Sequence, residues 1–173
     1  LSCEECFTDP GTTFEMNTVV KREQRHGYIF EVSANNPKSS KPIPLKEMGR
    51  FEHEAAAVDP VSGAIYLTED KHRSLLYRFI PNTLGKLIDG GKLQALSISK
   101  KPSFDTRNWQ TTSMNKDEWH DVEWIDLDNV DSDVNDLRLR GFELGASRFA
   151  RGEGICYADN SIFITATIGG AER

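Results

Sequence analysis

The N-terminal sequence Cys3-Glu4-Glu5-Cys6 places two thiols and two carboxylates within four residues. A structural zinc site would need a second cysteine pair at similar spacing, and the remaining cysteine, Cys156, does not supply one. A thioredoxin-type redox motif would need a βαβ context, which the neighbouring sequence does not predict. What remains is a thiolate beside carboxylates, a ligand set suited to a transition metal next to a hard cation. A surface acidic turn with a buried cysteine is the alternative.

Two further groups of titratable residues, His53-Glu54 and Glu69-Asp70, flank one predicted hairpin. Side chains at the ends of its strands can project into a shared site, which would bring carboxylates together for metal binding. An isolated pair of acids at this position is also typical of a solvated turn.

The segment Arg151-Gly-Glu153-Gly154 combines a guanidinium, a carboxylate and two glycines. The glycines permit close backbone approach, and the planar fork of arginine matches phosphate oxygens. An arginine cannot ligate a cation, so we expect Arg151 to bind substrate. In an extended strand, Arg151 and Glu153 would point to the same face. The alternative is an ion pair between Arg151 and a neighbouring acid on the surface.

The elements that must position these residues are predicted to be mostly β-strands. Proline and glycine in Asp59–Gly63 are typical of a tight turn between two of them. A helical period is weak and confined to Asn129–Arg140, and the polar stretches Asn35–Pro44 and Lys100–Met114 predict loops. The predicted strands are Tyr28–Val32, Ala55–Val58, Ala64–Thr68, Ser74–Phe79, Gly91–Ile98, Val122–Leu127, Ile155–Ala158 and Ser161–Thr165.

An internal repeat relates two of the predicted hairpins. Glu54–Thr68 can be laid on Glu153–Thr165 if the second turn is two residues shorter, and the copies start 153 − 54 = 99 positions apart. That spacing is about twice a propeller-blade period of roughly 40–50 residues. Glu4 lies 50 positions before Glu54, again near one blade. Acids recurring at blade intervals would meet at one end of a central channel. Chance similarity between short hairpins is the alternative.

The overall composition is that of a globular protein. The 173 residues include 21 Lys and Arg and 27 Asp and Glu, which gives a net charge of −6 and argues against a nucleic-acid partner. The apolar runs are too short to span a bilayer, and three cysteines do not predict a disulfide framework. We expect the chain to be an internal fragment of a longer protein, so that the lack of a targeting segment says little about compartment.

In combination, several of these segments resemble the PhoX family of bacterial alkaline phosphatases. Cys-Glu-Glu, His-Glu-Ala and Arg-x-Glu-Gly occur in the family's order and extend over nearly the whole chain. The segments that carry the resemblance are Leu1–Glu5, Gly49–Pro60, Tyr66–Asp70, Ser74–Phe79 and Arg148–Ile155.

The resemblance implies a cluster of iron and calcium at one end of a β-propeller channel. It implies that Cys3 is the thiolate ligand of iron and that Glu54 and Glu153 are carboxylate ligands of the cluster. Glu4 and Glu69 are implied as further calcium or iron ligands, and Arg151 as the residue that binds the substrate phosphate. The residue between Arg151 and Glu153 is glycine, where the family would lead one to expect proline or another residue.

The resemblance also sets the expected fold and activity. We expect residues 1–173 to be a single all-β domain, part of a longer β-propeller, with roughly three to four blades. The parent protein is expected to be a periplasmic or extracellular phosphatase that hydrolyses small phosphate monoesters, and the fragment alone would lack the metal ligands that the other blades carry. Two alternatives are a non-catalytic calcium-binding propeller domain and a lactonase-like calcium propeller hydrolase.

Overall fold

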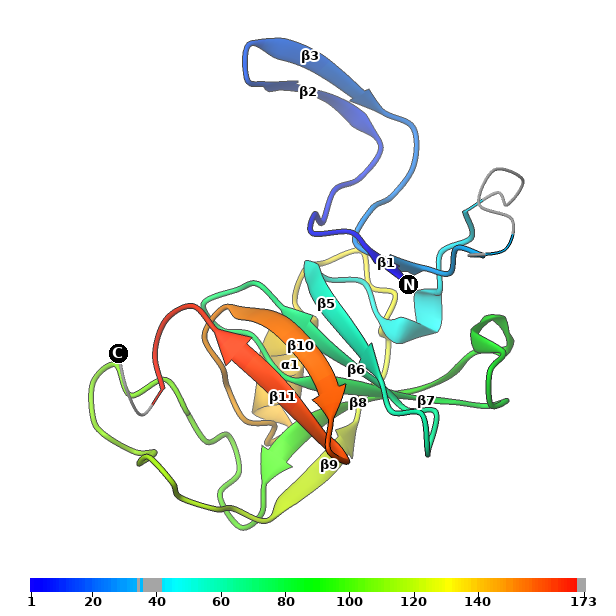
Figure 1. Cartoon of the computed structure of the whole chain (residues 1–173). Coiled ribbons are helices and arrows are strands. Elements are labelled where there is room, and N and C mark those ends of the chain that lie inside the picture. The colour runs from blue at the N-terminus through cyan, green and yellow to red at the C-terminus, as the bar shows by residue number, and fades with distance from the viewer. Residues whose placement is uncertain (34, 36–41, 171–173) are drawn as a thin grey trace.

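The computed structural model describes residues 1–33, 35 and 42–170, and within them the chain is predominantly β (Figure 1). One five-stranded and three two-stranded antiparallel sheets are formed by these residues, together with the short helix α1 (Leu137–Glu143). Single 3₁₀ turns occur at Lys46–Met48 and Leu87–Asp89. The strands are β1 (Ser2–Cys3), β2 (Gly11–Glu15), β3 (Thr18–Arg22), β4 (Ile29–Phe30), β5 (His53–Val58), β6 (Ile65–Glu69), β7 (Tyr77–Pro81), β8 (Gly91–Ile98), β9 (Val122–Asp126), β10 (Gly152–Ala158) and β11 (Ser161–Ala166).

The five-stranded sheet is a meander in the order β5-β6-β7-β8-β9. Its strands alternate side chains between two faces, as the period of a strand requires. One face carries Leu67, Tyr77 and Ala95, all completely buried, and it packs against the N-terminal segment through Met48 and Phe51. This is the hydrophobic core.

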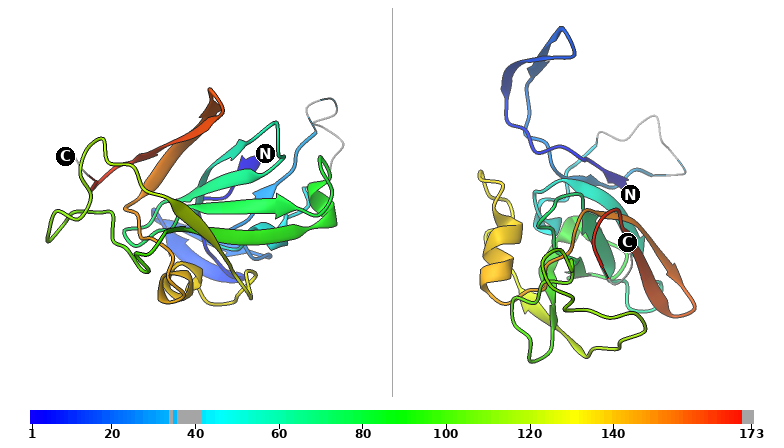
Figure 2. Two further views of the ribbon diagram at one scale, coloured as in Figure 1. Left: turned by 90° about the horizontal axis from the view of Figure 1, so that it is seen from below. Right: turned by 90° about the vertical axis from the view of Figure 1, so that its left-hand side faces the viewer.

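Helix α1 and the β10–β11 hairpin lie on opposite sides of this sheet (Figure 2). Helix α1 approaches the core face closely, because a Cβ on Gly141 would meet the Leu75 side chain at 2.6 Å. The other face, with Tyr66 and Trp124, turns towards β10 and β11, and these elements line a shared apolar cavity of about 430 Å³. The hairpin that carries Glu153 is therefore held against the hairpin that carries Glu54.

The two hairpins share a β-bulge at the same place, next to their acids. In the first, the pairing His53↔Glu69 is followed by Ala56↔Leu67, so that two residues of β5 oppose the single residue Thr68. A bulge of this kind changes the direction of a side chain relative to the regular alternation of the strand. Glu54 is one of the two residues in this bulge.

The second hairpin repeats this register residue for residue. The pairing Gly152↔Ala166 is followed by Ile155↔Ile164, so that Glu153 and its neighbour oppose Thr165. Because the bulged acids are equivalent, the internal repeat seen in the sequence is a structural repeat.

The Thr68 hydroxyl joins the two hairpins. It is almost completely buried, accepts a hydrogen bond from the Ala55 amide at 3.1 Å and donates one to the Glu153 carbonyl at 2.6 Å. The equivalent Thr165 is exposed and bonds only within its own hairpin, to the Gly154 carbonyl at 3.3 Å. The spacing between the two acids thus depends on one hydroxyl.

The β2–β3 hairpin extends away from the rest of the molecule as an arm (Figure 1). Its two-residue turn, Met16-Asn17, has positive φ at both positions, as in the turns that suit the twist of a hairpin. Phe14 and Val19 face each other across the strands and are largely exposed. The sequence analysis did not predict this hairpin.

The β-dominated fold confirms the predicted class. Six of the eight predicted strands correspond closely to observed ones, Ser74–Phe79 overlaps β7 only at residues 77–79, and Tyr28–Val32 is reduced to the two residues of β4. The predicted loop Lys100–Met114 contains no strand, whereas most of the predicted loop Asn35–Pro44 lies outside the described residues. No helix in the described part of the chain is long and apolar enough to cross a membrane.

We predict that Thr68→Val destabilises the chain by about 1–3 kcal/mol, because the change leaves the part-buried Ala55 amide and Glu153 carbonyl without this partner. Thr68→Ser, which keeps the hydroxyl, should restore most of that stability. Thr165→Val is the matched control at the equivalent exposed position and should change the free energy of unfolding little. Urea unfolding of the three variants measures these differences, and equal effects at Thr68 and Thr165 would contradict the bridging role.

Candidate metal and phosphate site

Three carboxylates from distant parts of the chain converge beside the bulge of β5. Glu5, Glu54 and Asp70 each offer an oxygen within 4.8 Å of the others. Glu5 follows β1, Glu54 sits in the bulge, and Asp70 follows β6. Backbone hydrogen bonds hold these segments together, from the His53 amide to the Glu4 carbonyl at 3.2 Å and from the Asp70 amide to the Glu52 carbonyl at 3.3 Å.

Two more of the predicted ligands border this cluster. Burial raises the pKa of Glu54, and the charges of Glu5, Glu153 and Asp70 raise it further. Burial also raises the pKa of the half-buried Cys3 thiol, and the charge of Glu54 adds to that rise. The Glu153 carboxylate and the Cys3 thiol therefore both lie within electrostatic range of Glu54.

Such a convergence of like charges is unfavourable without a cation. Carboxylates that face one another disfavour each other's ionised form, and a bound metal ion reverses that preference. The donor set of carboxylate oxygens fits a hard cation such as calcium, and a neighbouring thiolate fits iron. The residues present thus fit both metals that the resemblance implies.

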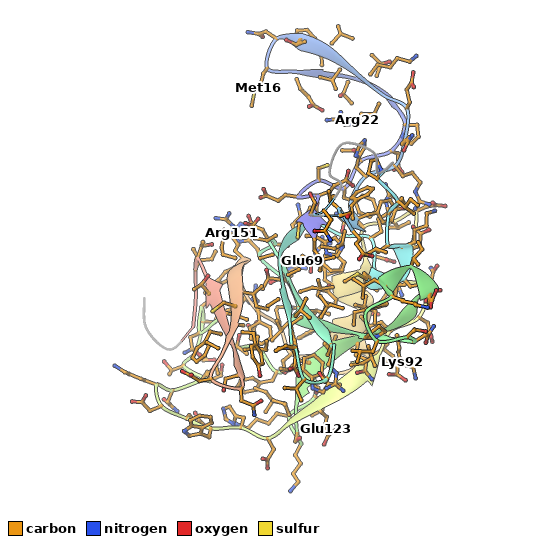
Figure 3. All side chains as sticks on the ribbon, turned by 45° about the vertical axis from the view of Figure 1, so that its right-hand side comes forward. Met16, Arg22, Glu69, Lys92, Glu123 and Arg151 are labelled. Atoms are coloured by element: carbon orange, nitrogen blue, oxygen red, sulfur yellow. The ribbon has the colours of Figure 1, made fainter. Side chains whose placement is uncertain are left out.

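Arg151 lies at the edge of the cluster, at the end of the β10–β11 hairpin (Figure 3). Its guanidinium donates two parallel hydrogen bonds to Asp70, each of 2.7 Å, and lies 3.7 Å from Glu153. Its φ of 50° is left-handed, so the prediction of an extended backbone at this residue is wrong. The glycine that follows begins β10, and the side chains of Arg151 and Glu153 still reach the same site. The predicted alternative, a pair with a neighbouring acid, is also present.

Glu4 lies close to the cluster but points away from it. Its carboxylate accepts hydrogen bonds from the amides of Gly27 at 2.9 Å and Tyr28 at 3.2 Å, and it contacts the His26 ring at 2.8 Å. These bonds fix the backbone between Cys3 and Glu5. The structure brings Glu5, and not Glu4, to the other carboxylates.

Glu69 is completely buried beneath the site. Its carboxylate accepts a hydrogen bond from the Tyr77 hydroxyl at 2.9 Å and lies 3.7 Å from Arg138. Burial raises its pKa to about 7, against the opposing effects of Arg138 and Tyr77. It therefore belongs to the core, and Asp70, the next residue, supplies the carboxylate at the site.

Comparison with known proteins finds one matching family. The sequence model of the family described as "Alkaline phosphatase PhoX" matches residues 1–173. The chain belongs to the PhoX alkaline phosphatase family. A comparison with curated proteins finds no match.

Among solved structures, the chain is similar to PhoX of Pseudomonas fluorescens, determined in complex with vanadate, a transition-state analogue. The TM-score is 0.55 and the sequence identity 19%, and the match covers 80% of this chain. It covers 27% of the Pseudomonas PhoX chain, so this chain spans little more than a quarter of that protein. At this identity the likeness shows the fold alone.

The PhoX resemblance named Glu4 and Glu69 as ligands, whereas Glu5 and Asp70 are the acids that lie beside Glu54 in the structure. The alternation of strand side chains was the signal that could have found them. Ile65, Leu67 and Glu69 share the core face of β6, so the residue after Glu69 must turn outward. Glu5 lies two residues after Cys3, the spacing at which an extended chain places side chains on one face.

A buried histidine next to Glu54 makes the stability of this region pH-dependent. His53 is completely buried, stacks on Phe51 at 3.6 Å and bonds through Nε2 to the Gly49 carbonyl at 3.0 Å. Burial lowers its pKa to about 3, so it remains neutral in the folded protein at neutral pH.

We predict that His53 makes the free energy of unfolding fall as the pH drops from about 6.5 towards 3. The unfolded state takes up a proton near pH 6.5 and the folded state does not, so acid favours unfolding. Glu69 acts in the opposite direction between about pH 4.5 and 7, because its folded pKa is raised. His53→Gln should remove the His53 contribution when its pH profile is subtracted from that of the wild type. The exposed His72→Gln is the control, and identical profiles for wild type and His53→Gln would contradict the assignment.

Proposed function

We propose that this chain carries part of the catalytic centre of a secreted PhoX-type phosphatase that hydrolyses small phosphate monoesters. The observation that supports it best is the convergence of Glu5, Glu54 and Asp70, with Arg151 held on Asp70 at 2.7 Å. Oxygen ligands for a cation and a guanidinium fork for a phosphate are then side by side. Membership of the PhoX family supplies the reaction class.

The proposed metals are calcium and iron. Glu5, Glu54, Asp70 and Glu153 would hold calcium through carboxylate oxygens, and Cys3 would hold iron through its thiolate. When bound, these ions would supply positive charge against the oxygens of the transferring phosphoryl group. The geometry favours Glu5 and Asp70 over Glu4 and Glu69 as ligands.

The residues of the chain have distinct parts in this proposal. Arg151, whose side chain is 37% exposed, would turn the free N–H groups of its fork towards the phosphate oxygens. Asp70 would orient that fork, and Glu4 would fix the backbone that presents Cys3 and Glu5. The vanadate in the solved PhoX relative is a transition-state analogue, which agrees with a site for a phosphoryl group.

The fold in this proposal is part of a β-propeller. The β5–β8 meander has the four antiparallel strands of a blade, and the equivalently bulged β10–β11 hairpin would be the inner pair of the next. Residues 1–173 would then be one continuous piece of a single propeller domain. The predicted three to four blades and the periplasmic or extracellular location remain predictions.

The proposed activity can be tested on the full-length enzyme with a chromogenic phosphate ester and a lactone, each with and without chelator. Phosphatase activity that chelator abolishes, with iron in the active protein, supports the proposal. Lactone hydrolysis, or no hydrolysis with calcium bound, would favour one of the two alternative propeller functions. Active phosphatase without iron would remove the proposed role of Cys3.

We predict that Glu54→Gln weakens calcium binding by the 173-residue chain by about tenfold or more, because it removes a charged ligand from the centre of the cluster. Isothermal titration with calcium measures the change. Glu23→Gln is the matched control, since Glu23 is largely exposed and pairs only with Lys21 among the described residues. Equal calcium affinities for wild type and Glu54→Gln would contradict the site.

We predict that Arg151→Lys in the full-length enzyme keeps the metal content and lowers kcat/KM roughly tenfold or more, because lysine cannot form the bidentate contact with phosphate. Metal analysis and steady-state kinetics with one phosphate ester measure the two effects separately. Loss of metal, or wild-type kinetics, would show that Arg151 does not serve the substrate.

A further inference from the structure

Besides the apolar cavity between the sheet and the β10–β11 hairpin, a polar cavity lies between the loop 105–113 and Arg148. Its volume is about 370 Å³, within the range of small-molecule pockets. Arg107, Trp109 and Arg148 contribute its charged and aromatic walls. Neither these residues nor the cavity belongs to the carboxylate cluster.

Arg148 has no carboxylate within ion-pair distance among the described residues, although the charge of Asp105 acts on it from further away. Its guanidinium stacks on the Phe142 ring, 3.5 Å from the ring centroid, and forms no hydrogen bond or ion pair with the described residues. Its Nε is fully enclosed and has no hydrogen-bond partner. A buried donor left without a partner costs stability, and an anion beside this guanidinium would offset its charge.

The charges around Arg148 leave an excess of positive charge in the cavity. The Asp105 carboxylate accepts two hydrogen bonds from Arg107, at 2.7 and 2.6 Å, so its charge is offset by that residue. Burial lowers the pKa of Arg148, and the positive charges of Arg107 and Arg73 add to that effect, while the charge of Asp105 opposes it. One guanidinium therefore remains to be neutralised, in a chain whose net charge is −6.

The other wall of the cavity suits a flat organic group. The indole of Trp109 is 40% exposed, and the Arg107 guanidinium stacks on it at 4.1 Å from the centroid. Arg107 also donates to the His72 carbonyl at 3.0 Å, which anchors this wall to the turn after β6. The wall is thus built by packed side chains and not by a free loop tip.

We propose that this cavity binds an organic oxyanion, with its phosphate, phosphonate or carboxylate group on Arg148 and its organic part against Trp109. A guanidinium matches two oxygens of such a group, and an indole face stacks on a ring. The site is separate from Arg151, so the proposal does not depend on the phosphatase function.

The test is an NMR titration of the metal-free 173-residue chain with phenylphosphonate and, in parallel, inorganic phosphate. The indole N–H resonance of Trp109, assigned by Trp109→Phe, reports on the cavity. We expect both probes to shift it, with phenylphosphonate binding more tightly because its ring adds stacking. If only inorganic phosphate shifts it, the organic part of the proposal is wrong, and if neither does, the whole proposal is wrong.

Two variants separate this site from the candidate catalytic site. Arg148→Met keeps the stem on Phe142 and should weaken binding about tenfold or more, because a charge-assisted bond is lost. Arg151→Gln should leave the Trp109 titration unchanged. Loss of the shift in Arg151→Gln, or its retention in Arg148→Met, would overturn the proposal. If Arg148→Met fails to fold, the Nε–H resonance of Arg148 in the wild-type chain is followed during the phenylphosphonate titration. A shift of this resonance supports the proposal, and no shift contradicts it.

Discussion

The hydrogen bond from the Thr68 hydroxyl to the Glu153 carbonyl is the contact on which the rest of the site depends. It joins two hairpins that are separate sheets, at the level of their bulges, so it sets how far apart Glu54 and Glu153 stand. A bulge alone would aim each acid outward. The bridge between the bulges, together with the hydrogen bond from the Arg151 amide to the Lys71 carbonyl at 2.8 Å, brings the two acids to one site.

The remaining members reach the site because strands have two faces. In β6, the face that carries Leu67 continues into Glu69, and the chain turns only at Asp70, after the strand has ended. Burying Glu69 leaves Asp70 on the side of the site, where Arg151 and the other carboxylates meet it. A one-residue shift in this register would exchange the two acids between core and site.

Much of the fold was accessible from the sequence, because the turn residues and alternation of β5–β9 act locally. The β2–β3 arm could not be predicted, because Gly11–Arg22 has no buried face and therefore no hydrophobic pattern. For the site, motifs located Cys3, Glu54 and Glu153, whereas choosing between Glu69 and Asp70 required the register. Glu4 points away from the carboxylate cluster because its carboxylate accepts hydrogen bonds from the Gly27 and Tyr28 amides. These residues are distant in sequence, so no local pattern reveals the contacts.

The electrostatics of the site explain why its scaffold must be rigid. Glu5, Glu54 and Asp70 raise the free energy of the folded state when all are ionised, and a flexible loop would relieve that repulsion by moving apart. Asp70 is instead held by a backbone bond to Glu52, Glu54 lies within strand β5, and Arg151 pairs directly with Asp70 alone of the three. A cation bound by these acids would lower the energy of the folded state and leave the unfolded chain unchanged, so metal binding and stability are coupled here. The two arginines proposed to bind anions differ in their charge balance. Arg151 already forms an ion pair with Asp70, whereas Arg148 forms none with the described residues.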